Sequence, residues 1–126
     1  MIPHGMFHWN ELMTRDEKKA MAFYEKTIGW SFDVMPMVPE GIYNVAMHDG
    51  KPVGGIVQMK GPEYEGVPEH WMGYLSVDDI DARLKTAVAE GATILQEPFD
   101  VPQVGRIAII KDGGGAVIGW ITPAEG

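Results

Sequence analysis

The sequence contains no cysteine, very little serine and no long apolar run. Without cysteine the chain cannot form disulfides, thiolate metal sites or iron–sulfur clusters, and it has no cysteine nucleophile. Ser31 and Ser76 are the only serines, and neither lies in a Gly-x-Ser-x-Gly motif, which argues against a serine hydrolase. No apolar run approaches the roughly 20 residues that a membrane-spanning helix needs. These absences leave carboxylates, imidazoles and aromatic side chains as the candidate functional groups.

Basic residues are also scarce. The 126 residues include 10 Lys and Arg against 18 Asp and Glu, so the formal net charge is −8, and the isoelectric point is about 4.8. Binding to phosphate backbones or anionic membranes requires clustered Lys and Arg, so we expect neither nucleic acid nor membrane as a partner. The N-terminal residues lack the basic and apolar regions of a signal peptide, and the expected location is the cytoplasm.

The two halves of the sequence repeat one pattern. A shift of 62 positions pairs His8-Trp9 with His70-Trp71, whereas a shift of 63 pairs Asp16 with Asp79, so the register is open by one residue. Each half has the pattern of one strand, one helix and three strands. We therefore expect an α+β fold built from two tandem βαβββ units within a single domain over residues 1–126. The units span 7–60 and 70–122, with a linker over 61–69 that could act as a flap.

Start and stop signals predict the individual elements. Thr14 stands three residues before Glu17, which is the spacing of a capping box, and Gly29 is placed to end the first helix. Ala20, Phe23, Tyr24, Thr27 and Ile28 form the apolar stripe that this helix is expected to bury. The predicted strands cover 7–13, 30–35, 42–48, 53–60, 70–77, 93–96, 106–111 and 116–121, and the second helix covers 79–90.

Three segments carry a resemblance to a known family: residues 10–16, residues 23–30 with Phe-Tyr followed by Ile-Gly-Trp, and residues 111–116 with their Gly-rich turn. The chain resembles the vicinal oxygen chelate superfamily, which includes glyoxalase I, bleomycin-resistance proteins and extradiol dioxygenases. Within it the sequence looks most like single-module glyoxalase-like proteins of unassigned activity. The resemblance implies a curved mixed sheet around a cavity and a homodimer. It does not assign a reaction, because one fold hosts many chemistries.

The resemblance also implies four metal-ligand positions, on the first and last strands of the two units. In this sequence they fall at Trp9, Met72, Gly119 and, in the first unit, Val57 or Ile56. None of these side chains is a ligand that divalent ions use. We therefore expect no metal ligands and no essential cofactor.

The alternative register would instead turn His8 and His70 toward the cavity, because a one-residue slip moves every side chain to the other face. The last strands, 54–59 and 116–121, then offer only Gln58 as an oxygen donor. A divalent metal is possible in this register but disfavoured. Histidines at strand ends more often serve as solvated or capping groups.

Glu11 is the candidate catalytic residue. If Trp9 faces the cavity, Glu11 and Met13 do too, because side chains alternate along a strand. A carboxylate desolvated among apolar groups suits proton transfer or pairing with a cation. The alternative is a solvated or structurally paired carboxylate on the outer face. The expected ligand-binding residues are Trp9, Met13, Met72, Tyr74, Arg106 and Trp120, with Arg106 closing over the pocket or pairing with Glu11.

Three functions stay open at this point. The first is binding of a small organic molecule without an essential metal, and the negative net charge favours a cationic one. The second is a glyoxalase-like lyase, isomerase or hydrolase that uses Glu11 as general base, with or without a metal. The third is an interaction module without a ligand, which a very small pocket would favour. The sequence leaves open whether the protein is an enzyme.

Overall fold

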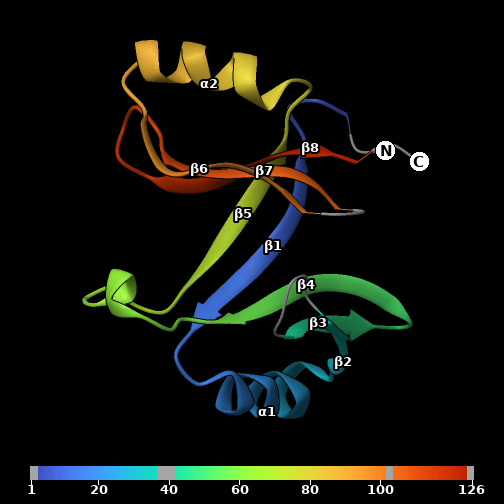
Figure 1. Ribbon diagram of the computed structural model, residues 1–126. Coiled ribbons are helices and arrows are strands. Elements are labelled where there is room, and N and C mark those ends of the chain that lie inside the picture. The colour runs from blue at the N-terminus through green and yellow to red at the C-terminus, as the bar shows by residue number, and fades with distance from the viewer. Residues whose placement is uncertain (1–2, 37–41, 102–103, 125–126) are drawn as a thin grey trace. The chain divides into compact units, whose positions relative to one another are not determined.

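The computed structural model describes residues 3–36, 42–101 and 104–124 (Figure 1). The chain divides into two compact units: residues 10–71 form the N-terminal unit, and residues 1–9 with 72–126 form the C-terminal unit. In chain order, the elements of the first half are β1 (Phe7–Thr14), α1 (Glu17–Ile28), β2 (Ser31–Pro36), β3 (Ile42–His48), β4 (Lys51–Gln58) and the 3-10 turn η1 (Pro62–Tyr64). Those of the second half are β5 (His70–Ser76), α2 (Ile80–Ala89), β6 (Thr93–Val101), β7 (Gly105–Lys111) and β8 (Val117–Pro123).

The order of elements confirms the predicted α+β fold. Each half of the chain contains one strand, one helix and three further strands, which is the tandem βαβββ pattern expected from the repeat. In each half the first strand pairs in parallel with the last one, β1 with β4 and β5 with β8, while the remaining pairs are antiparallel. The sheets are therefore mixed, as expected. Among the described residues, no helix has the length and hydropathy needed to span a bilayer.

The N-terminal unit is a sheet in the order β2-β3-β4-β1, with α1 along one face (Figure 1). That face is identified by Asn44 on β3, whose Nδ2 donates a 2.8 Å hydrogen bond to Glu17 Oε2 on α1. Ile56 on β4 is the register partner of both Asn44 and Leu12. Directly paired residues point to the same face of a sheet. Asn44, Leu12 and Ile56, all buried, therefore lie on the α1 side.

Helix α1 begins at a different cap from the one predicted. Asp16, not Thr14, caps it, because Asp16 Oδ1 accepts a 3.0 Å hydrogen bond from the Lys19 amide. Thr14 Oγ1 instead accepts from the Asp16 amide at 3.3 Å. Asp79 caps α2 in the same way, accepting from the Ala82 amide at 3.2 Å. Since Asp16 and Asp79 hold equivalent positions, a shift of 63 residues relates the first strands and helices of the two halves.

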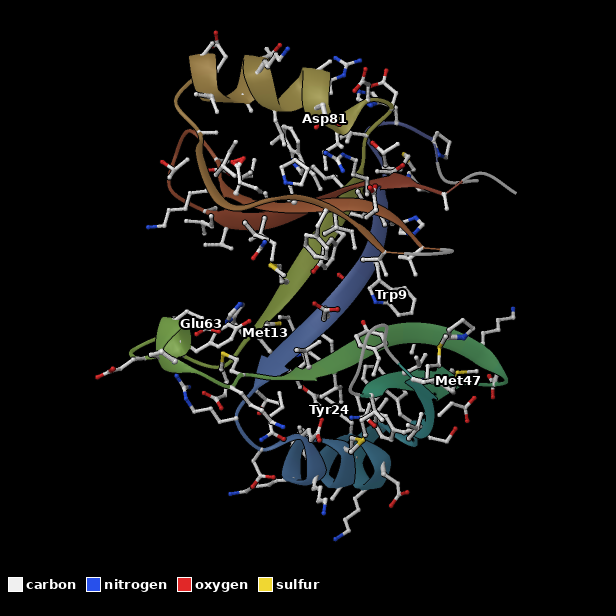
Figure 2. All side chains as sticks on the ribbon, viewed as in Figure 1. Trp9, Met13, Tyr24, Met47, Glu63 and Asp81 are labelled. Carbon is white, nitrogen blue, oxygen red and sulfur yellow. The ribbon has the colours of Figure 1, made fainter. Side chains whose placement is uncertain are left out.

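The predicted apolar stripe of α1 is only partly covered. Phe23 is 57% exposed and Ile28 is 56% exposed, whereas Tyr24 is half-buried. Figure 2 shows Tyr24 between α1 and the sheet. Its ring stacks on Trp30, with centroids 5.1 Å apart, and its hydroxyl accepts a 3.1 Å hydrogen bond from Trp71 Nε1. The helix therefore turns Tyr24 inward, and the Phe23 ring contacts Tyr24 edge-on. Gly29 has a φ of 87° and ends the helix as predicted.

The C-terminal unit is a sheet in the order β5-β8-β7-β6, with α2 along one face (Figure 1). The core under α2 consists of Val77, Ile80, Leu84, Ala108 and Ile110, with Ile118 and Trp120 packed against it. Strand β6 extends to Val101, well beyond the predicted 93–96. The pairing of β6 with β7 shifts register on either side of Gln96, and Pro98 lies within the second shift. Strand β6 is at the edge of the sheet, and an edge strand tolerates proline because its outer side has no neighbouring strand to which a backbone amide must donate.

Candidate functional site

The centre of the candidate site is a hydrogen bond between Tyr43 and Glu11. The Tyr43 hydroxyl donates to Glu11 Oε2 at 2.7 Å, and the contact is partly buried. Gly55 on β4 pairs with Glu11 on β1 and with Val45 on β3, so these three residues form one row across the sheet. A Cβ at position 55 would overlap the hydroxyl and ring of Tyr43. Tyr43 therefore reaches Glu11 by crossing directly over Gly55.

This pair lies on the face of the N-terminal sheet opposite α1. Because Asn44 points toward α1, its neighbours Tyr43 and Val45 point the other way. Met13 shares the face of Glu11, and Met13 and Val45 are each only 5% exposed. Glu11 and Tyr43 are half-buried. A carboxylate and a phenol thus share a face with buried apolar side chains.

The same alternation along β1 answers the register question. Trp9 takes the side of Glu11, and His8 takes the side of Leu12. The 63-residue shift pairs His70 with Phe7, so His8 and His70 do not occupy equivalent positions. His70 Nδ1 lies 2.8 Å from the Pro68 carbonyl oxygen. His8 Nδ1 is buried and has no hydrogen-bond partner among the residues that the structure describes, while the residue as a whole is half-buried. The expectation that His8 is a solvated or capping group stays a prediction.

The segment after β4, residues 60–69, is fastened to the end of β1 by Arg15. The Arg15 guanidinium donates to Glu69 Oε1 at 2.7 Å and to the Tyr64 carbonyl at 2.6 Å, and its amide donates to Glu69 Oε2 at 2.8 Å. These contacts, here called the Arg15 clamp, give the predicted linker a fixed anchor. The hydrogen bond from the Arg15 amide, together with the Arg15 charge, holds the pKa of Glu69 below its ordinary value.

Tyr64 is a residue near Glu11 that the sequence did not single out. Its side chain is half-buried, and burial raises the pKa of its phenol, with further increases from the negative charges of Glu63 and Glu11. Figure 2 shows the neighbouring Glu63 on η1. An aromatic residue within a Gly-, Pro- and Glu-rich segment was the available signal, since Tyr64 and Val67 are the two half-buried residues of the segment 60–69.

The Arg15 clamp predicts a pH-dependent contribution to stability. Because the pKa of Glu69 is lowered on folding, the clamp stabilises the fold above the ordinary Glu pKa and loses its effect as the pH falls through the lower, folded value. We expect E69Q to lower the melting temperature at neutral pH and the difference from wild type to shrink in acid. Thermal scans from pH 7 to pH 3 measure the difference in melting temperature between E69Q and wild type. The control is E65Q, which removes an exposed carboxylate from the same segment. A difference that stays constant down to pH 3 would contradict this role.

In the C-terminal unit, Tyr74 on β5 lies over Gly119 on β8. The two residues are register partners, and a Cβ at Gly119 would overlap the Tyr74 ring. Met72 and Tyr74 are 3% and 6% exposed. Trp120, one residue after Gly119, packs against the core under α2, so Tyr74 and Gly119 lie on the opposite face. The expectation that Trp120 joins Met72 and Tyr74 in one lining was therefore wrong, because consecutive strand residues point to opposite faces.

Arg106 is also placed differently from the expectation. Its guanidinium donates to Asp81 on α2 at 2.9 and 3.1 Å and to Asp100 on β6 at 3.3 Å. Figure 2 shows Asp81 on α2. The hydrogen bonds from Arg106 lower the pKa of Asp81. Arg106 thus ties α2 to the edge of its own sheet, and the predicted pairing with Glu11 was wrong.

The positions that would hold a metal in the family do not fit one here. Glu11 and Tyr74 are equivalent under the 63-residue shift, so their partners Gly55 and Gly119 are equivalent as well. The last-strand position of the first unit is therefore Gly55, not Val57 or Ile56. Trp9, Met72, Gly55 and Gly119 offer no ligand atoms. Within the described ranges, no group of three or more His, Asp or Glu side chains is arranged to hold a metal ion.

Comparison with known proteins identifies the family. Residues 5–119 match the model of the Glyoxalase/Bleomycin resistance protein/Dioxygenase superfamily. The chain belongs to this superfamily. CFP32 of Mycobacterium tuberculosis strain CDC 1551 / Oshkosh, provisionally named a glyoxylase, is 38% identical over 120 residues, which cover 95% of this chain and 45% of that protein. The chain thus spans about half the length of this relative.

Solved structures in the comparison share the fold. Methylmalonyl-CoA epimerase from Mycobacterium tuberculosis has a TM-score of 0.67 at 16% identity, and the match covers 99% of this chain and 94% of that one. A variant of the Streptomyces coelicolor methylmalonyl-CoA epimerase, in complex with 2-nitronate-propionyl-CoA, has a TM-score of 0.68 at 17% identity, covering 98% and 100%. These solved structures agree with the fold class predicted from the sequence.

Proposed function

We propose that this superfamily member binds a small organic ligand at the Glu11–Tyr43 pair, without an essential metal. The observation that carries the proposal is the 2.7 Å hydrogen bond that holds the Glu11 carboxylate on the sheet face opposite α1. A polar pair of fixed geometry on a face with buried apolar side chains is typical of sites that orient small molecules. The complex of a structural neighbour with 2-nitronate-propionyl-CoA supports small-molecule binding by this fold.

The charge of the site favours a cationic ligand. Two carboxylates, Glu11 and Glu63, are close enough to Tyr64 for their negative charges to raise the pKa of its phenol. The positive charge of Arg15 is paired with Glu69. The net charge of −8 adds long-range attraction for cations. Met13, on the Glu11 side of β1, is proposed as an apolar contact for the body of the ligand, and Trp9, Met72 and Tyr74 stay candidates in the C-terminal unit.

An enzymatic function is the second candidate. The structural neighbours are named epimerases, and the mycobacterial relative is provisionally named a glyoxylase. Glu11 would then act as general base on the bound molecule, with Tyr43 fixing the orientation of its carboxylate. A homodimeric assembly and a cytoplasmic location also stay predictions.

Replacing Glu11 tests the proposed site. Benzylamine, which is protonated at neutral pH, and benzyl alcohol, its neutral analogue, are titrated into wild type and E11Q by calorimetry. We expect wild type to prefer benzylamine, and E11Q to weaken benzylamine binding by roughly ten- to a hundredfold, because a hydrogen bond to a charged group is lost. Benzyl alcohol affinity should change little.

The matched control is E25Q, which removes an exposed carboxylate from α1 in the same unit. It should leave both affinities unchanged. Equal benzylamine affinities in E11Q and wild type would contradict the proposed site. For the enzymatic alternative, E11Q would abolish turnover of a substrate while leaving the affinity for a neutral substrate near that of wild type.

A further inference from the structure

The C-terminal unit contains a groove between α2 and the edge strand β6 (Figure 1). Its volume is about 430 Å³, which lies in the range of pockets that hold small molecules. Helix α2 forms one wall with residues spaced at i, i+3, i+4 and i+7, which share one helix face: Asp81, Leu84, Lys85 and Val88. Leu84 is 4% exposed and belongs to the core under α2. The groove therefore has a buried apolar floor on the helix side.

A bulge in β6 forms the opposite wall. Between Gln96 and Phe99, β6 has one more residue than the segment of β7 that pairs with it. The residues in this interval are Glu97 and Pro98, and both line the groove together with Ile94. Consecutive residues of a regular strand point to opposite faces, whereas a bulge re-aims a side chain. The bulge thus explains how a carboxylate and an apolar ring from adjacent positions come to line the same groove.

The two walls carry opposite charges. Lys85 lies on the α2 wall and Glu97 on the β6 wall, and neither side chain forms a hydrogen bond or ion pair with another residue in the described part of the chain. Lys85 contributes to the lowered pKa of Asp81 through its charge alone. Asp81 itself is held by the Arg106 guanidinium at 2.9 and 3.1 Å. The groove therefore offers one ammonium and one carboxylate to a ligand, on opposite sides of an apolar floor.

An amino acid with an apolar side chain matches these features. Its carboxylate would pair with Lys85, its ammonium would pair with Glu97, and its side chain would cover the floor at Leu84 and Ile94. A simple organic cation would meet the like charge of Lys85, and a simple organic anion would meet that of Glu97, so both are disfavoured. We propose that the α2–β6 groove is a binding site for a free amino acid with an apolar side chain. None of its lining residues belongs to the Glu11–Tyr43 site, so the proposal is independent of the proposed function.

Three probes of similar shape test the charge recognition. L-Phenylalanine has both charges, hydrocinnamate lacks the ammonium, and phenethylamine lacks the carboxylate. Each is titrated into wild type, and the methyl NMR signals of Leu84 and Val88 report binding in the groove. Because Lys85 and Glu97 are exposed, each charge contributes as a surface ion pair does, and we expect L-phenylalanine to bind about two- to fivefold more tightly than either analogue. L-Phenylalanine that leaves both methyl signals in place, or equal affinities for the three probes, would overturn the proposal.

Two variants assign the charges to their residues. K85Q should weaken binding of L-phenylalanine and hydrocinnamate without weakening that of phenethylamine. E97Q should weaken binding of L-phenylalanine and phenethylamine without weakening that of hydrocinnamate. The matched controls are K111Q and E90Q, which remove exposed charges of the same two types from the same unit and should leave all three affinities unchanged. L-Phenylalanine affinities in K85Q and E97Q equal to those in the controls would overturn the assignment of the site.

Discussion

Replacing Gly55 by alanine is expected to displace Tyr43 from Glu11. The added Cβ would overlap the Tyr43 hydroxyl and ring, and a strand backbone between two paired strands cannot retreat from the contact. Overpacking of this kind costs about 1–3 kcal/mol. We therefore expect G55A to lower the free energy of unfolding by that amount and to lose most of the preference for benzylamine over benzyl alcohol. Urea denaturation and the two probe titrations measure these effects.

A double-mutant cycle with Y43A separates the overlap from other effects. Once the Tyr43 ring is removed, the alanine at position 55 has space, so the two substitutions should be strongly non-additive. The control is G114A, whose Cβ would meet only Asp112 Oδ1 at 3.6 Å and should cost little. A G55A protein that keeps the wild-type preference for benzylamine would show that Tyr43 does not cross this glycine.

Leu84→Ala is expected to cause the largest loss of stability. Leu84 is 4% exposed, and it anchors α2 to the core formed with Ile80, Ala108 and Ile110. Deleting a buried leucine side chain costs about 2–5 kcal/mol, because apolar contacts are lost and a cavity remains. The free energy of unfolding from urea denaturation gives the value.

Val88→Ala on the same helix is the matched control. Val88 is 49% exposed, so its truncation should lower the free energy of unfolding much less than the truncation of Leu84. Similar losses for both variants would mean that α2 does not pack through the Leu84 face.

The sequence was informative wherever a local signal decides the structure. Gly29 ends α1 because a glycine adopts the left-handed conformation without steric cost. The repeat of strand, helix and three strands is visible because each element has its own period and its own turn residues. The alternation that placed Trp9, Glu11 and Met13 on one side of β1 also follows from local geometry alone.

The error at Trp120 was avoidable by the same geometry. Counting from the Asp112 turn placed Gly119 at the ligand position of the last strand. Trp120 follows it directly and must therefore point to the other face, where α2 packs. The second glycine, Gly55, required the pairing register of β1 with β4, which the sequence does not specify to one residue.

Other features depended on contacts between residues far apart in the chain. Arg106 had 18 acidic residues as possible partners, and its pairing with Asp81 joins residues 25 positions apart. The Arg15 clamp spans 54 positions. Such pairs are selected by the folded geometry, so neither the clamp nor the placement of Tyr64 near Glu11 follows from local patterns.

The most direct test of the Glu11–Tyr43 site is the methyl NMR signal of Met13 during a benzylamine titration. Met13 is 5% exposed and lies on the Glu11 side of β1, so the ring of a ligand bound at Glu11 should shift its methyl resonance. We predict a saturable shift of the Met13 signal in wild type, absent in E11Q, with the Met21 signal on α1 unchanged in both. A Met13 signal that stays in place while benzylamine binds, or throughout the titration, would contradict the site.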